Sequence, residues 1–260
     1  MYIFDSHCHL DDKSYSKDLG AVLERARKAG VMRMMTIGVN GQTSGQAVSL
    51  ANSFEGVYAS VGVHPHDVKN CSDSVLHYLA GLAENAQVRA WGEIGLDFNR
   101  MYSPRKDQEK WFERQLEMGG RLGLPLIFHE RDSNGRLLEI IKSRGLAEMN
   151  GVVHCFSGNR QELDQYLDLG LHIGITGIIT MKSRGAQLRE LAPIIPAERL
   201  LVETDAPYLV PAPEKNHSRR NEPAFVKSVL LELAGVRKVD PDQLARIVWQ
   251  NTCQLYGLAE

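Results

Sequence analysis

Histidines and carboxylates in a few short motifs are the residues of this chain that could do chemistry. His7 and His9 stand one residue apart in the segment Phe4-Asp5-Ser6-His7-Cys8-His9. If this segment is an extended strand, both imidazoles lie on one face, about 6.6 Å apart at the backbone. Two rings on one face can converge on a single cation. The pair therefore predicts a metal-binding site, although two neighbouring histidines can also be ordinary structural residues.

More residues of the ligand type follow later apolar runs of the sequence. They are His64, His66, Glu93, His129, His154 and Asp205. Imidazoles and carboxylates without thiolates suit zinc or manganese, with magnesium also possible. The number of ligands predicts two divalent ions, and paired ions can activate a water and stabilise a leaving oxygen. Neutral imidazoles with only two carboxylates leave such a centre positively charged, so it should attract an anionic phosphate and hydrolyse its ester.

Three other residues of ligand type receive no metal role. His172 lies inside a predicted strand, before Gly174, and His77 lies on a predicted helix. Cys155 follows His154 directly, so in a strand it should face away from its neighbour, and we interpret it as structural.

Short apolar runs that alternate with helical patterns must position these residues. Eight strands are predicted: 2–6, 32–38, 57–62, 89–94, 124–129, 151–154, 171–175 and 200–203. Alternation of this kind is typical of βα units around a parallel sheet, and eight strands close a barrel. In such a barrel the chemistry gathers at the carboxyl ends of the strands, which is where the candidate ligands stand. The predicted fold is a single α/β domain over residues 1–260, a (β/α)8 TIM-type barrel with extra C-terminal helices.

Helical periodicity and end signals predict the helices between the strands. Leu19, Val22, Leu23 and Ala26 form one apolar stripe, and Gly30 should end that helix. Ser103 as N-cap and Pro104 as first residue should open a helix that ends near Gly123. Further helices are predicted at 47–54, 74–85, 134–143, 161–169, 186–191, from Pro223 onward, and at 241–256. The long irregular stretch 206–221 is of the kind that is usually functional.

Composition limits the classes of function. The formal net charge is −2 with 24% charged residues, which excludes a generally basic nucleic-acid coat, so any polyanion contact must be local. The start of the chain has no signal-peptide pattern, and no 18-residue apolar run occurs, so we expect a cytoplasmic protein without membrane contact. The four cysteines are scattered without a C-x-x-C pair, which predicts reduced, mostly buried thiols.

Read together, the motifs resemble the TatD family of metal-dependent deoxyribonucleases. They are Asp5–Asp11, Gly62–His66, Gly92–Asp97, His154–Gly158, Glu203–Tyr208 and Arg219–Pro223, and they span most of the chain. The resemblance implies a distorted, cytoplasmic barrel whose two-metal centre hydrolyses DNA phosphodiesters, often from a 3′ end, on single-stranded or frayed ends in repair or turnover. No obligate protein partner is evident.

The resemblance also implies roles for the candidate ligands. His7, His9, Glu93 and Asp205 would hold one ion, and Glu93, His129 and His154 the other. Glu93 would thus bridge the two ions. Asp205 would in addition accept a proton from the attacking water, so Glu93 and Asp205 are the predicted catalytic residues.

Substrate contacts are predicted at His64, His66, Arg131, Arg219, Arg220 and Asn221. The two arginines at 219 and 220 stand before the helix that Pro223 should open, where guanidinium groups and a helix N-terminus could clamp a phosphate. A solvated arginine pair is the alternative. The segment Glu130-Arg131-Asp132-Ser133 departs from the family pattern around its arginine, which we interpret as substrate tuning.

Two other functions are compatible with the same ligands. One is a metal-dependent hydrolase of small esters, amides or aminoacyl-nucleic acids, which would not need the phosphate-type donors at Arg219, Arg220, His64 and His66. The other is a binding or assembly protein on an inactive barrel, against which the intact ligand set argues.

Overall fold

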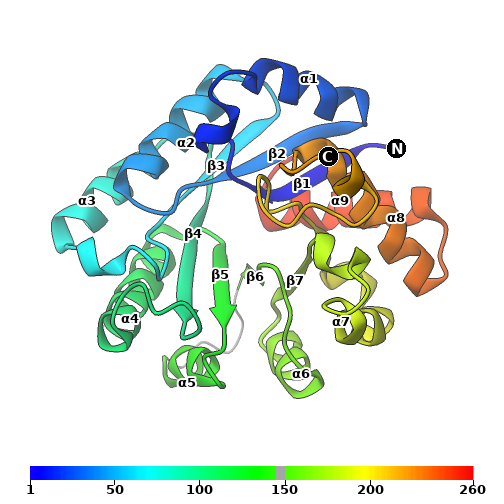
Figure 1. The fold of residues 1–260 in the computed structure, drawn as a ribbon. Coiled ribbons are helices and arrows are strands. Elements are labelled where there is room, and N and C mark those ends of the chain that lie inside the picture. Colours follow the sequence, from blue (N-terminus) through cyan, green and yellow to red (C-terminus); the bar gives the residue numbers. More distant parts are fainter. Residues whose placement is uncertain (145–149, 260) are drawn as a thin grey trace. The chain divides into compact units, whose positions relative to one another are not determined.

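Strands and helices alternate along the whole chain in the computed structural model, which describes residues 1–144 and 150–259 (Figure 1). Each strand pairs in parallel with a neighbour, and the order of the sheet is that of the chain, β1 to β8. The strands are β1 Ile3–Cys8, β2 Val31–Ile37, β3 Val57–Val61, β4 Val88–Asp97, β5 Leu126–Arg131, β6 Gly151–Val153, β7 His172–Ile175 and β8 Leu200–Val202. All eight predicted strands are confirmed, and the chain-order parallel sheet is that of a (β/α)8 barrel.

Nine α-helices connect and follow the strands in the described residues. They are α1 Leu19–Lys28, α2 Gly41–Ser53, α3 Asp73–Leu82, α4 Arg105–Leu122, α5 Arg136–Ser143, α6 Arg160–Asp168, α7 Ala186–Leu191, α8 Val226–Arg237 and α9 Pro241–Leu255. The last two are the predicted extra C-terminal helices. Among all the described residues, no helix combines the length and the apolar character that a bilayer crossing requires.

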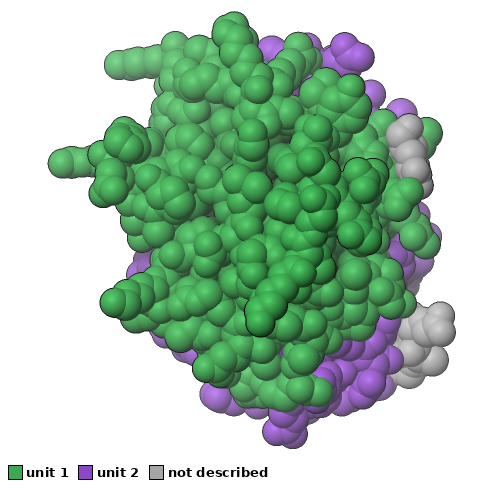
Figure 2. Space-filling model, turned by 90° about the vertical axis from the view of Figure 1, so that its right-hand side faces the viewer, with its two compact units in different colours: residues 1–36, 155–160, 172–260 green, residues 37–154, 161–171 purple. Residues whose placement is uncertain are grey.

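The chain divides into two compact units, which Figure 2 colours separately. Unit 1 comprises residues 1–36, 155–160 and 172–260, and unit 2 comprises residues 37–154 and 161–171. The single domain expected from the sequence stays a prediction.

Unit 1 has its core around β1, β8 and the C-terminal helices. Val22, Leu23 and Ala26 on α1 are buried, as the apolar stripe predicted. The ring of Phe4 on β1 lies 6.1 Å from the ring of Trp249 and 6.0 Å from that of Tyr256. Such aromatic clusters fix the angle between a strand and its covering helix, because each ring buries a large apolar area.

Unit 2 shows where two helix starts differ from the sequence prediction. The second helix begins at Gly41, six residues before the predicted start, because Asn40 and Thr43 form a capping box that compensates for a polar first turn. The fourth helix has Pro104 and not Ser103 at its N-cap. The hydroxyl of Ser103 instead donates to the carbonyl of His66. Gly123 ends this helix in the left-handed conformation with φ 64°, as predicted.

The stretch between β8 and α8 is largely irregular, as expected, apart from a short 3-10 helix at Glu214–Asn216. Pro223 opens a second 3-10 helix, Pro223–Phe225, and α8 follows it directly.

The cysteines are four free thiols, which agrees with the predicted reduced state. Cys8 and Cys253 are buried, whereas Cys71 and Cys155 are partly exposed. Burial raises the pKa of Cys71 to about 11 and raises the pKa values of Cys8 and Cys155 as well.

Candidate metal centre

In unit 1 the end of β1 and the segment after β8 are joined by backbone hydrogen bonds. The amide of Asp205 donates to the carbonyl of His7 at 2.9 Å, and the amide of His9 donates to the carbonyl of Ala206 at 2.7 Å. Asp205 itself has φ 57°. These bonds fix three of the predicted ligands, His7, His9 and Asp205, which we call the β1–β8 ligand group.

The donor atoms of the β1–β8 ligand group converge. Oδ1 of Asp205 lies 3.3 Å from Nε2 of His9 and 3.8 Å from Nε2 of His7, and all three side chains are largely buried. Two ligands at about 2.1 Å from a tetrahedral ion stand about 3.4 Å apart, so this spacing fits a divalent cation.

Buried polar side chains support the turn that carries Asp205. The amide and hydroxyl of Thr204 donate to the two carboxylate oxygens of Asp5 at 2.8 and 2.6 Å. The side-chain amide of Asn221 donates to the carbonyls of Thr204 and Tyr208 at 2.9 and 2.6 Å. Asp5 and Asn221 therefore hold the backbone on both sides of Asp205.

In unit 2 Glu93 lies within β4, which runs four residues beyond it, and not at the strand end that the sequence predicted. The pairing of β4 with β5 shifts register between Gly92 and Ile94. Such an irregularity re-aims a side chain, in this case that of Glu93. A Cβ atom on Gly95, whose φ is 147°, would overlap the carbonyl oxygen of His129. Glycine at 95 therefore allows β4 to approach β5 where both carry predicted ligands.

Oε1 of Glu93 stands among three histidines. It lies 2.7 Å from Nδ1 of His129, 3.5 Å from Nε2 of His64 and 4.0 Å from Nε2 of His154. Glu93 and His154 are 3% and 5% exposed, so the carboxylate is shielded from solvent. Glu93, His129 and His154, which we call the β4–β5 ligand group, are thus brought together within unit 2. Their role as ligands of one ion stays a prediction.

Asp97 is a site residue that the sequence prediction missed. Its Oδ2 lies 2.7 Å from Nε2 of His66 and 3.2 Å from Nε2 of His129. Although burial opposes ionisation, hydrogen bonds from His129 and His66 lower the pKa of Asp97. An anionic partner on the far nitrogen of a ligating histidine orients the ring and raises its basicity. The signal was present, because Asp97 follows Glu93 by four residues on the same strand and therefore shares its face.

The surroundings of two neighbouring histidines push their pKa values in opposite directions. Burial, with the nearby His129, lowers the pKa of His64 to about 4. Burial also opposes the charged form of His129, but hydrogen bonds to Asp97 and Glu93 outweigh it and raise its pKa to about 9. Nδ1 of His64 accepts the amide of His66, so neutral His64 carries its proton on Nε2. This nitrogen lies 3.1 Å from Nδ1 of His129 and 3.5 Å from Oε1 of Glu93.

The predicted substrate residues fall into distinct environments. His64 is buried beside the β4–β5 ligand group, whereas His66 is partly exposed next to it. Arg131 ends β5 and is partly exposed, and Arg219 is exposed on its loop. Asn221 is buried in the backbone contacts given above, which is a supporting position.

Arg220 is engaged within unit 1. Its guanidinium donates to both carboxylate oxygens of Asp18 at 2.9 and 2.7 Å and to Glu222 at 3.0 Å, and lies over the ring of Tyr15 at 4.7 Å. These contacts give Arg220 the environment of a structural ion pair.

Cys155 has a structural environment, as predicted, but for a different reason. It lies beyond the end of β6 with φ 50°, so strand alternation does not place it. Its amide donates to Oε1 of Glu203 at 2.6 Å, and its Sγ lies 3.4 Å from the hydroxyl of Thr176.

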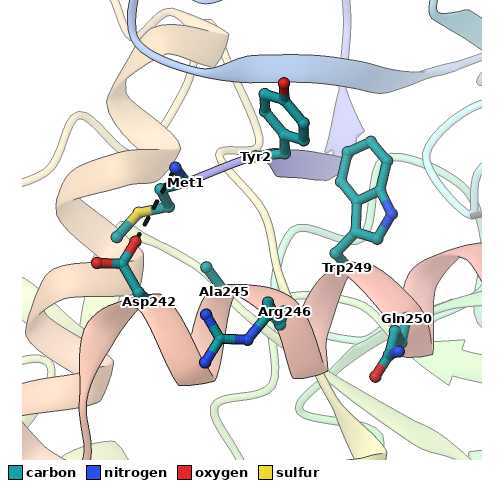
Figure 3. Close-up of a pocket in the computed structure, with 7 residues that line it drawn as sticks. All are labelled: Met1, Tyr2, Asp242, Ala245, Arg246, Trp249 and Gln250. Atoms are coloured by element: carbon teal, nitrogen blue, oxygen red, sulfur yellow. Dashed lines mark ion pairs between the residues drawn. The ribbon is translucent and has the colours of Figure 1, made fainter.

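A cavity of about 370 Å³ lies in unit 1 between the first residues of the chain and α9 (Figure 3). It is lined by Met1, Tyr2, Asp242, Ala245, Arg246, Trp249 and Gln250. None of these is a predicted site residue. The cavity adjoins the amino end of β1, whereas the β1–β8 ligand group stands at the carboxyl end of that strand. We therefore place the chemistry at the ligand groups and not at the cavity.

A parallel β/α chain order with histidines and carboxylates in the carboxyl-terminal parts of the strands or just after them is the arrangement of a TIM-barrel hydrolase of the amidohydrolase type. The model of the family described as TatD related DNase matches residues 4–257. The chain therefore belongs to the TatD-related DNase family, which hydrolyses phosphodiester bonds. The predictions of family, fold and enzyme class are confirmed.

Individual relatives match over their full length. A protein named 3′-5′ ssDNA/RNA exonuclease TatD from Klebsiella pneumoniae (strain 342) is 42% identical over 258 residues, 98% of each chain. One of the same name from Salmonella typhimurium is 40% identical over 256 residues, again 98% of each. The crystal structure of a TatD homologue from Escherichia coli K12 has a TM-score of 0.91 at 32% identity, covering 99% of this chain and 98% of the other.

Proposed function

We propose that this chain is a metal-dependent 3′-5′ exonuclease that acts on single-stranded DNA and RNA. The observation that carries the proposal is the clustering of imidazole and carboxylate donors in each of the two ligand groups. Relatives with the printed name of a 3′-5′ ssDNA/RNA exonuclease share about two fifths of the residues over the full length, which supports the substrate class.

We propose two divalent ions, zinc, manganese or magnesium, as the cofactors. His7, His9, Glu93 and Asp205 would hold one and Glu93, His129 and His154 the other, with Glu93 shared. When bound, the ions would activate a water and stabilise the leaving oxygen of the ester. The distances between the donor atoms of the β1–β8 ligand group and the absence of thiolate donors from both groups support this assignment.

The residues of the chain then have defined tasks. Asp205 is the proton acceptor for the attacking water, and Asn221 holds the carbonyls of Thr204 and Tyr208 on either side of it. Asp97 keeps the ring of His129 oriented toward Glu93. His64, which is buried with its Nε2 toward His129 and Glu93, supports the β4–β5 ligand group.

The place of action and the wider substrate contacts are further parts of the proposal. We propose a cytoplasmic enzyme of DNA repair or turnover, working as one domain. Among the predicted phosphate contacts, His66, Arg131 and Arg219 keep this assignment because their side chains are at least partly exposed.

The experiment is digestion of end-labelled single-stranded DNA and RNA by metal-reconstituted protein, beside a neutral ester. Loss of nucleotides from the 3′ end is expected, and it should cease in Glu93→Gln protein that remains folded. Consumption of the ester alone would instead support the small-molecule hydrolase. Anomalous scattering from manganese- or zinc-soaked crystals should show two peaks, and a single peak would contradict the two-metal assignment.

A further inference from the structure

Each unit presents one exposed tyrosine in edge contact with a candidate site histidine. In unit 2 the ring of Tyr102 lies 4.8 Å from that of His66 at 73°, and Tyr102 is 55% exposed. In unit 1 the ring of Tyr208 lies 5.8 Å from that of His9 at 68°, and Tyr208 is 54% exposed. A single exposed aromatic residue is ordinary on a protein surface, but contact with a site histidine in both units requires an explanation.

The loop of Tyr102 is fixed on both sides of the tyrosine. Oδ1 of Asp97 accepts the amides of Asn99 and Arg100 at 3.0 and 2.7 Å. The side-chain amide of Gln108 donates to the carbonyls of Asp97 and Ser103 at 3.0 and 2.9 Å. An aromatic ring on a backbone held in this way loses little freedom when it binds, so it is a preorganised contact.

Tyr208 is held in a comparable way within unit 1. Its amide donates to the carbonyl of Asp205 at 2.8 Å, and its carbonyl accepts the side-chain amide of Asn221 at 2.6 Å. The candidate ligand Asp205 and the exposed ring thus belong to one turn.

The charges near Tyr102 suit a single strand of nucleic acid. Lys69 and Arg100 are exposed, and the amide of Lys69 is bonded to the hydroxyl of Ser103, next to Tyr102. A few local cations with an aromatic ring are the elements with which proteins bind single strands without reading their sequence. Because the chain has a net charge of −2, its overall field does not attract polyanions, so base stacking would add to the affinity that the local cations supply.

We propose that Tyr102, beside His66, and Tyr208, beside His9, are stacking platforms for unpaired bases of a nucleic-acid substrate. The inference rests on the proposed nuclease function and adds the reason for its choice of substrate. A base in a duplex is already stacked on its neighbours and paired, so only an unpaired end can offer its face to either ring. The platforms therefore select unpaired ends and tolerate any base.

The test measures kcat/KM of the metal-loaded full-length protein on a 5′-labelled DNA strand. Tyr102→Ala and Tyr208→Ala should each lower kcat/KM by about 5- to 150-fold, the range for one base–aromatic stack. Tyr102→Phe and Tyr208→Phe should retain the parent value, because the ring is kept. Tyr78→Ala is the matched control, since Tyr78 is 52% exposed on α3 and has no place in the site.

A second substrate separates stacking from other roles of the ring. On a strand whose two 3′-terminal nucleotides lack their bases, the parent should be slower, and the alanine variants should lose nothing further. Equal losses on both strands, or losses in the phenylalanine variants as large as in the alanine variants, would overturn the inference. If the parent degrades no nucleic acid, the proposed function itself fails. If the parent is active and both alanine variants match it, the stacking inference alone is wrong.

Discussion

Asp97 uses its two carboxylate oxygens for different purposes. One oxygen accepts backbone amides of the loop that carries Tyr102, and the other faces His66 and His129. An asparagine could keep the first contact, but the nitrogen in place of Oδ2 would donate where an acceptor is needed. The substitution therefore removes the carboxylate contact to His66 and His129 while the loop contact is kept.

For Asp97→Asn we expect metal affinity to fall by about 10- to 100-fold, the usual cost of removing the partner of a ligating histidine. Isothermal titration with zinc or manganese measures this directly. Asp168→Asn, at an exposed position at the end of α6, is the control and should leave the affinity unchanged. An affinity within twofold of the parent in Asp97→Asn would show that His129 does not depend on this carboxylate.

At the scale of the elements, the approach of β4 to β5 depends on Gly95. Gly95→Ala combines a backbone conformation that L side chains rarely adopt with overlap on the carbonyl of His129. We expect a loss of about 1–3 kcal/mol in the free energy of unfolding, together with weaker metal binding. Gly120→Ala on α4, where a Cβ would meet nothing within 4 Å, should instead raise stability by about 0.5–1 kcal/mol. Denaturant unfolding of both variants measures these changes in the free energy of unfolding. A Gly95→Ala protein as stable as the parent would contradict the close approach of β4 to β5.

Arg219 and Arg220, adjacent on the loop between β8 and α8, should have different roles. Arg219 is exposed, so Arg219→Ala should weaken binding of single-stranded DNA and lower the salt slope by about 0.7, the value for one phosphate contact. Arg220→Met should leave the salt slope unchanged and lower the melting temperature, since Arg220 binds Asp18 and Glu222. DNA binding measured across a salt series, together with thermal melts, distinguishes the two variants. A reduced salt slope in Arg220→Met would show that Arg220 contacts a phosphate.

The effect of Arg220→Met on stability should also depend on pH in a known direction. Hydrogen bonding from Arg220 lowers the pKa of Asp18. A carboxyl whose pKa is lower in the folded state than in the unfolded state stabilises the folded protein. This contribution is fully present above the unfolded pKa of about 3.9, and it is lost as the pH falls through the folded pKa. The difference in melting temperature between parent and variant should therefore shrink between pH 7 and pH 3. A difference that grows on acidification would contradict the ion pair.

For the whole molecule, metal should act as a stabilising ligand. Free ion at 100 times its dissociation constant adds about 2.7 kcal/mol to the native state. For a chain of this size that corresponds to roughly 5–10 °C in melting temperature. Melting before and after chelation, with re-addition of zinc or manganese, measures the effect. A melting temperature that chelation leaves unchanged would argue against resident ions.

The sequence predicted the strands well, and it marked side chains that the structure brings together within each unit, because both depend on local patterns. The role of these side chains as metal ligands stays a prediction. Buried parallel strands are apolar runs, and the chain order of a barrel follows from them. The misses depend on contacts between distant residues. Ser103 is not an N-cap because its hydroxyl bonds the carbonyl of His66. The ion pair of Arg220 with Asp18, which is 202 residues away in the sequence, also could not be read from a local pattern. The sequence did not predict a role for Tyr102 and Tyr208, because a local pattern does not show which rings contact a histidine.

The thiols of this chain have a practical consequence for loading it with metal. Burial raises the pKa of Cys71 to about 11, so its thiolate fraction at neutral pH is far below that of a free cysteine. Burial protects Cys8 in the same sense. Air oxidation proceeds through the thiolate, so it should be slow at these positions. The protein can therefore be purified and stored without dithiothreitol, a reagent that chelates zinc and would compete with the ligand groups for it.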